Sequence, residues 1–397
     1  MPDTQQQSTR TTSTSSSSSS SSQSGGYSGG GNQANLEQVI VYLTQNSVTH
    51  ENDEIPETLA ALKKADNDGL GKKKLLPISD PYSNGHQTYD YAFGSNKADA
   101  VTWWHDDNSL KSGQVKLNGQ VLDIGAHDTS NGSDAAFLSK MQGDWRTLLA
   151  HVGLSEDKAD EVVAALLQDE EGKAKLTKSG GRASNELIQL ISVLNRAENG
   201  EFEISSLVLS GHHYSNTDYI FGELPGHQYD TAKDVGDTLN LHDIEALKDV
   251  FPKAYSQVDS FMFSACNTHK LGMEDDEGNA LSTPEWVSGV FPEATKMAHW
   301  EGIAPGSDFA AFWSGEFMLD VAKEDAGQDA AFNDARWRST KKGSNHRFEK
   351  GADGKFTDTK AAKNNRSYVY NDYKGLRNSG GESFTKRSDL KKYLYNK

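Results

Sequence analysis

The stretch that organises the chain is Asp259-Ser-Phe-Met-Phe-Ser-Ala-Cys266-Asn-Thr-His269, which holds the only cysteine of the sequence. A short apolar run, Phe261 to Phe263, predicts a buried strand that carries Cys266 just beyond its carboxyl end. A cysteine thiol becomes an effective nucleophile when a neighbouring imidazole takes its proton. The stretch therefore raises the question of which histidine lies beside it.

A second stretch has the same shape, Ser206-Leu-Val-Leu-Ser-Gly-His212-His213. Here too a short apolar run ends in small residues and then in a side chain that can take part in chemistry. Functional sites in open α/β sheets form at the carboxyl ends of the strands. If the two predicted strands are parallel neighbours, they bring His212 and Cys266 together as a proton acceptor and a nucleophile.

The two motifs resemble those of the caspase-like cysteine peptidases of clan CD, over roughly Ser184 to Val321, about a third of the chain. They are most similar to the motifs of the bacterial members, including the CHAT peptidases. The resemblance implies that His212 is the general base and Cys266 the nucleophile of a cysteine-type endopeptidase. It also implies hydrolysis of peptide bonds through a thioester, with no cofactor.

The chain departs from the family pattern at two positions. The family usually has glycine after the catalytic histidine, whereas this chain has His213. The resemblance implies that the backbone N–H groups of His213 and Cys266 stabilise the oxyanion. Relatives that cut after Arg or Lys often carry an acidic residue two places before the cysteine. This chain has Ser264 there, so that position does not support a preference for cleavage after Arg or Lys.

The resemblance also implies that the strand after the cysteine strand, expected from Ala294 to Trp300, forms a wall of the substrate pocket. Trp300 and Glu301 are the expected substrate-binding residues on that strand, together with Ser264 from the cysteine strand. An ordinary strand end remains an open alternative for Trp300 and Glu301.

The predicted fold class is α/β, a caspase-like and mainly parallel central sheet with helices on both faces. Four regions are expected: a disordered Ser/Gly-rich leader at 1–35, a poorly defined region at 36–118, the peptidase domain at 119–328, and a basic, loop-rich tail at 329–397.

Several elements follow from local patterns. Helices are predicted after the N-cap Ser155, after Ser184 and after Asn240, and a further helix after Ser307. Val121 to Ile124 is predicted as the first strand of the sheet. The segment from Lys341 to Arg366 is predicted as loop, followed by a short helix from Arg387 to Tyr395.

Composition limits the partners and the location. The mean hydropathy is −0.71, and no apolar run approaches the roughly 20 residues of a membrane span. The N-terminus predicts no ordinary secretion signal, so the expected location is cytoplasmic, or outside by another export route. A single cysteine excludes an internal disulfide and suits a reducing compartment.

The net charge of −17 is unevenly distributed. From Arg336 to Lys397 there are 17 Lys and Arg against 6 Asp and Glu, which gives +11 and leaves −28 for the remainder. An acidic body argues against nucleic acid as a partner. The expected partners are a protein or peptide substrate and, as an open alternative, an activating protein.

Other functions remain open from the sequence alone. Cys266-Asn-Thr-His269 has the spacing of zinc ligands, with His212 and His213 on the neighbouring strand. A catalytically degenerate caspase-like binding module is the second alternative, because His213 departs from the family pattern. Two weaker metal candidates are a calcium loop at Asp66 to Gly69 and the His-Asp pairs at 105–106 and 127–128.

Overall fold

The fold is built on a seven-stranded sheet whose order is β12-β11-β10-β9-β6-β1-β2. In this computed structural model the described residues are 36–45, 58–59, 62–78, 101–103, 109–111, 113–124, 135–169, 171–173, 175–179, 183–222, 238–302, 304, 317–318, 321–323, 325 and 343–358.

The centre of the sheet is parallel. Its parallel strands are β1 (Gln38–Thr44), β2 (Lys74–Ile78), β6 (Glu203–Ser210), β9 (Ser260–Ser264) and β10 (Lys296–Gly302). The remaining two strands, β11 (Gly343–Lys350) and β12 (Phe356–Asp358), extend the sheet in antiparallel fashion beyond β10. The prediction of a mainly parallel sheet in an α/β protein is confirmed.

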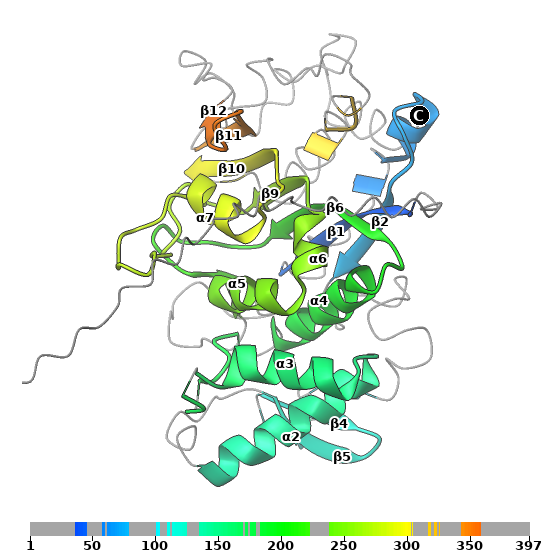
Figure 1. Ribbon diagram of the computed structural model, residues 1–397, viewed down its shortest axis with the longest axis vertical. Helices are drawn as coiled ribbons and strands as arrows, with labels where there is room; N and C mark the ends of the chain where they lie inside the picture. The colour runs from blue at the N-terminus through cyan, green and yellow to red at the C-terminus, as the bar shows by residue number, and fades with distance from the viewer. Residues whose placement is uncertain are drawn as a thin grey trace, which may run out of the picture. The chain divides into compact units, whose positions relative to one another are not determined.

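One face of the sheet packs against helices that lie near it in Figure 1. Phe261 and Phe263 of β9 share a buried core with residues of the helices α4 (Ala183–Glu198), α5 (Leu241–Val250), α6 (Pro252–Ser256) and α7 (Thr283–Val290). Trp286 of α7 packs against both phenylalanine rings, with centroids 6.1 and 5.8 Å away. Met262, on the opposite face of the sheet, is buried as well.

A further pair of helices extends this core. Helix α3 (Glu156–Leu167) contacts α5, and α2 (Ala135–His151) contacts α3. The Ser155 side chain accepts a hydrogen bond from the Lys158 backbone N–H, so Ser155 caps α3 as predicted. Asn240 caps α5 in the same way, by accepting from the His242 N–H.

The expected first strand, Val121 to Ile124, does not belong to the main sheet. Residues Gln120–Asp123 form β5, which pairs with β4 (Gln114–Leu117) in a separate three-stranded sheet with β3 (Val101–Trp103). The reason is the turn at Asn118 and Gly119, which both have positive φ, 51° and 84°. An Asn-Gly pair in this conformation closes a tight hairpin, so the strand pairs with its sequence neighbour.

The prediction of loop from Lys341 to Arg366 is wrong for the part that the structure describes, because β11 and β12 lie within it. The β11 residues Asn345 and Arg347 are buried although they are polar, so the strand lacks the apolar alternation that would have indicated it. The predicted helix at 387–395 lies outside the described residues.

The sheet also crosses the predicted domain boundaries. Strands β1 and β2 come from the region expected at 36–118, and β11 and β12 come from the region expected at 329–397. Residues 36–397 form one compact unit. Among the described residues, no helix has the length and apolar character needed to cross a membrane.

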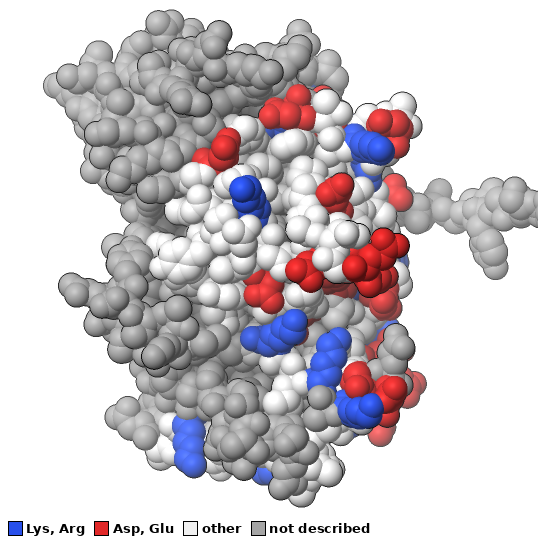
Figure 2. Space-filling model, turned by 90° about the vertical axis from the view of Figure 1, so that its left-hand side faces the viewer, with Lys and Arg blue, Asp and Glu red and all other residues white. Residues whose placement is uncertain are grey.

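The surface drawn in Figure 2 carries both signs of charge, with Lys and Arg side chains close to Asp and Glu side chains. An example of such pairing is Lys140, whose ammonium contacts Asp123 at 2.6 Å and Asp144 at 2.5 Å.

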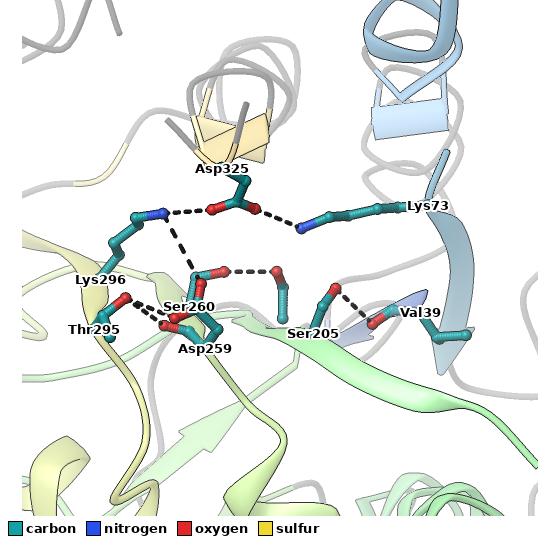
Figure 3. A network of polar contacts seen from close by, with 9 residues as sticks. Val39, Lys73, Ser205, Asp259, Ser260, Thr295, Lys296 and Asp325 are labelled. Carbon is teal, nitrogen blue, oxygen red and sulfur yellow. Dashed lines mark hydrogen bonds and ion pairs between the residues drawn. The ribbon is translucent and has the colours of Figure 1, made fainter. Parts of the chain in front are cut away.

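The amino-terminal edge of the sheet is held by a polar network (Figure 3). The Asp325 carboxylate contacts Lys73, which precedes β2, at 3.1 Å and Lys296, which opens β10, at 2.6 Å. Strands β1, β6 and β9 lie between β2 and β10, so this carboxylate links distant strands. Burial alone would raise the pKa of Asp325, but the hydrogen bond from Lys296 and the charge of Lys73 lower it overall.

We expect Asp325→Ala to lower the free energy of unfolding by about 1–3 kcal/mol, because it leaves two largely buried ammonium groups without their shared carboxylate. The side chains of Lys73 and Lys296 are only 10% and 14% exposed. The difference should shrink as the pH falls below about 4, since a carboxyl whose pKa is lowered by folding stabilises only while ionised. Urea denaturation at pH 7 and pH 3 measures both effects. Asp276→Ala, at an exposed turn, is the control, and equal stability of the two variants at pH 7 would contradict the prediction.

Candidate functional site

The two motifs meet at one edge of the sheet because β6 and β9 are parallel neighbours. Ser210, the last residue of β6, pairs with Ser264, the last residue of β9. The Gly211 N–H donates to the Ser264 carbonyl at 3.4 Å, so the pairing continues one residue further. His212 and Cys266 each follow two residues beyond the final pair, at the same edge of the sheet.

Gly211 is needed because the chain passes very close to its neighbours at this point. A Cβ atom there would lie 2.6 Å from Cγ2 of Ile220 and 3.0 Å from the Phe221 carbonyl oxygen. Its φ of +156° is also one that other residues rarely adopt. The glycine of the Gly-His motif therefore lets β6 run directly into the segment that carries the histidines.

His212 is held by β7 (Tyr219–Phe221). Its N–H donates to the Phe221 carbonyl at 2.8 Å, and its carbonyl accepts from the Phe221 N–H at 3.0 Å. The His212 and Phe221 rings lie 5.5 Å apart. The residue as a whole is partly exposed, but Nε2 of its ring is buried.

His213 is placed differently, because its side chain is only 2% exposed. Its Nδ1 lies 3.0 Å from the Cys266 carbonyl oxygen, and its Nε2 lies 3.0 Å from the Thr217 carbonyl oxygen. Burial lowers the pKa of His213, although the two carbonyl groups favour the protonated ring. Both ring nitrogens of His213 therefore face backbone oxygens.

Cys266 is partly buried. Burial raises the pKa of its thiol above the ordinary value, while hydrogen bonds from the backbone N–H groups of Ala304 and of Cys266 itself oppose that rise. The thiol is therefore protonated in the resting protein at neutral pH. A nearby base is then required for nucleophilic attack.

The turn that carries Cys266 is attached to β10. Asn267 has a φ of +53°, and its N–H donates to the Gly302 carbonyl at 2.6 Å. The His269 N–H donates to the Trp300 carbonyl at 3.1 Å. The Trp300 N–H donates in return to Oγ1 of the buried Thr268 at 3.1 Å. The carboxyl end of β10 thus lies directly beside the turn.

The three predicted substrate-binding residues differ in exposure. Ser264 is 4% exposed and Trp300 only 1% exposed, so both side chains lie inside the protein. The Glu301 side chain is 59% exposed. Glu301 therefore presents the one solvent-facing side chain of these three, and their roles in substrate binding stay predictions.

Sequence reasoning missed a cluster of ionisable side chains on β10, β11 and β12. His346 lies 3.0 Å from the Glu301 carboxylate through Nε2 and 3.0 Å from the Asp358 carboxylate through Nδ1. The hydrogen bond to Asp358 is the main reason that the pKa of His346 is raised. The buried His299 stacks on His346 at 5.6 Å, and burial lowers the pKa of His299 to about 3. No local signal in the sequence links these residues.

The metal alternatives gain no support from the described residues. Within those residues, no group of three or more His, Cys, Asp or Glu side chains is arranged to hold a metal ion. The stretch Asp66 to Gly69, a weak calcium candidate, ends a helical stretch, and Gly69 has the positive φ, 72°, that is common after a helix. The pairs at 105–106 and 127–128 lie outside the described part of the chain.

Comparison of the chain with protein-family models, with curated proteins and with solved structures finds no match in any of the three.

We expect Gly211→Ala to lower the free energy of unfolding by about 1–3 kcal/mol, because the new methyl group overlaps the buried Ile220 and the Phe221 backbone. The strain should also displace His212 and alter the alkylation rate of Cys266. Urea denaturation and iodoacetamide labelling measure the two effects. Gly289→Ala is the matched control, since its Cβ would meet nothing within 4 Å, and the prediction is wrong if both variants behave alike.

We expect His346→Gln to destabilise the protein by roughly 1 kcal/mol more at pH 6 than at pH 9. The pKa of His346 is raised on folding. Its ion pairs therefore stabilise the protein below the unfolded pKa of about 6.5 and lose that effect as the pH rises through the folded pKa. Urea denaturation of both proteins at the two pH values gives the difference. His299 stays neutral in this range, so an equal loss at both pH values would show that His346 acts by packing alone.

Proposed function

We propose that the chain is a cysteine-type endopeptidase that uses His212 and Cys266 as its catalytic dyad. The observation that carries this proposal is the pairing of β6 with β9, whose register ends at Ser210 and Ser264. The hydrogen bond between the His213 ring and the Cys266 carbonyl, at 3.0 Å, supports direct proximity of the two segments. A histidine and a cysteine brought together at a strand edge can perform nucleophilic acyl transfer.

The proposal includes the finer fold assignment, a caspase-like domain. Two features support it. The resemblance implies one helix between the histidine strand β6 and the cysteine strand β9, and helices α5 and α6 lie there in the chain, after the short strands β7 and β8 (Thr238–Asn240). Strand β10 follows the cysteine strand and lies beside it in parallel, which is the expected position of the strand that lines the substrate pocket.

In the first half of the proposed reaction, His212 takes the proton of the Cys266 thiol as the sulfur attacks the carbonyl carbon of the scissile peptide bond. A C–S bond forms, and the carbonyl oxygen becomes an oxyanion. His212 then donates its proton to the leaving amine. The C–N bond breaks, and a thioester with Cys266 remains.

The oxyanion needs hydrogen-bond donors at the sheet edge, and the backbone N–H groups of His213 and Cys266 are the proposed pair. Within the described residues, the His213 N–H donates no backbone hydrogen bond in the turns and loops. In the second half of the reaction, water attacks the thioester while His212 takes its proton. Breakage of the C–S bond releases the acid and regenerates the thiol, so no cofactor is required.

One observation favours the second candidate, a catalytically inactive binding module. Burial raises the pKa of Cys266, whereas many reactive cysteines have a lowered pKa. In the peptidase, this feature is consistent with a low resting reactivity that rises when a peptide substrate or an activating protein partner binds. In a binding module, the thiol would stay inert whatever is bound.

We expect a peptide-library screen to reveal cleavage by the wild-type protein and none by Cys266→Ala. His212→Ala should lower kcat/KM by roughly 10²–10⁴-fold, because it removes the general base. It should also slow the iodoacetamide labelling of Cys266 near neutral pH. His242→Ala, a partly exposed histidine on α5, is the matched control and should leave both rates unchanged.

Two results would contradict the peptidase proposal. The first is cleavage that persists in Cys266→Ala, which would point to a contaminating protease. The second is a wild-type protein that cleaves no peptide and whose Cys266 labels at the same slow rate with and without His212. That result would favour the binding module, and capture of a partner by Cys266→Ala as well as by wild type would establish it.

A further inference from the structure

The side chain of His213 bridges two backbone segments that belong to different motifs. Its Nδ1 faces the carbonyl oxygen of Cys266, beyond β9, and its Nε2 faces the carbonyl oxygen of Thr217, in the turn beyond β6, each at 3.0 Å. The ring is 2% exposed, so water has little access to these contacts. A buried bridge of this kind couples the positions of the two segments.

The contact with Cys266 is one of two contacts that hold the same peptide group, one at its carbonyl and one at its N–H. The peptide group between Cys266 and Asn267 is planar, so its carbonyl and its N–H point in opposite directions. His213 lies at the carbonyl of this group. The Asn267 N–H donates to the Gly302 carbonyl of β10 at 2.6 Å. With both ends held, the plane cannot rotate, and the direction of the Cys266 side chain is restricted.

The Thr217 and Cys266 carbonyl groups differ in whether they accept a hydrogen bond from a donor other than His213. The Thr217 carbonyl already accepts a hydrogen bond from the Gly272 N–H at 2.8 Å. For the Cys266 carbonyl, His213 is the only donor recorded among the described residues. A neutral imidazole donates from one nitrogen only, and a proton on Nδ1 gives the Cys266 carbonyl its donor among the described residues.

The turn that contains Thr217 is held by hydrogen bonds and close packing of its own. Thr217 Oγ1 donates to the Tyr214 carbonyl at 2.8 Å, and the Asn216 N–H donates to the Lys270 carbonyl at 3.0 Å. A Cβ at Gly272 would lie 2.8 Å from the Asn216 carbonyl oxygen. The turn therefore serves as a fixed support against which the His213 ring rests.

We propose that His213 is a positioning residue that donates from Nδ1 to the Cys266 carbonyl and so orients the Cys266 thiol toward His212. The proposal rests on the proposed function for its catalytic consequence, but the orientation of Cys266 can be measured without it. His213 makes no contact with substrate through its side chain in this role. It acts through the backbone of the nucleophile.

Two amide substitutions separate the two hydrogen bonds. The side-chain nitrogen of Asn can take the place of histidine Nδ1, and the longer side chain of Gln can place its nitrogen near histidine Nε2. His213→Asn therefore keeps a donor for the Cys266 carbonyl, whereas His213→Gln keeps one for the Thr217 carbonyl. Both variants lose the ring, so the comparison cancels the loss of its packing.

We expect His213→Gln to lower the rate of Cys266 alkylation and the value of kcat by about tenfold to a hundredfold, with little change in KM, because the nucleophile is misdirected. His213→Asn should stay within about threefold of wild type. His151→Gln, at the end of α2 and outside the site, is the control. Equal losses in the Asn and Gln variants, or no loss in either, would overturn the proposal.

A measurement on the wild-type protein covers the case in which a variant does not fold. The ¹⁵N chemical shifts of the His213 ring report which nitrogen carries the proton at neutral pH. A protonated Nδ1 supports the proposal, and a protonated Nε2 with a bare Nδ1 overturns it. Besides burial and the two carbonyl groups, Asp218 raises the pKa of His213 and His269 lowers it.

The outcomes also separate this proposal from the peptidase. If Cys266 alkylation follows the predicted order of variants but no peptide is cleaved, the positioning role stands and the peptidase fails. If wild type cleaves peptides and His213→Gln cleaves them equally well, the positioning role fails and the peptidase stands.

Discussion

The structure of the candidate site depends on the parallel pairing of β6 with β9. The register fixes Ser210 opposite Ser264, and every later contact at this edge builds on that pair. A slip of one residue would turn the side chains of β9 to opposite faces. Phe261 and Phe263 would then leave the aromatic core around Trp286. The same packing that stabilises the fold therefore sets the relative positions of His212 and Cys266.

The sequence predicted this pair of strands because each is a short apolar run followed by small residues, as is usual for the buried strands of a parallel sheet. The capped helices were predicted for an equally local reason, since Ser155 and Asn240 act on backbone groups two or three residues away. Strand β11 could not be predicted in this way. Its buried Asn345 and Arg347 fit the sheet only through tertiary contacts.

In the candidate site, too, the features set by local sequence were predicted and those set by tertiary contacts were not. Cys266 and His212 were found because each follows an apolar run within its own motif. The role of the His213 side chain depends on a carbonyl group 53 positions away along the chain, and the attachment of Asn267 to Gly302 depends on β10. Interactions of this kind arise only when separate segments fold together, so no local pattern of residues predicts them.

The raised pKa of Cys266 and the two contacts that hold the peptide group between Cys266 and Asn267 have a common origin. The turn from Cys266 to His269 is packed against β10, which removes water from the thiol and at the same time fixes its direction. Burial disfavours the thiolate, so in the proposed peptidase His212 would accept the proton during attack rather than beforehand. Such a mechanism depends on orientation more than on a preformed charge, so the backbone contacts around Cys266 matter as much to the proposal as the two side chains of the proposed dyad.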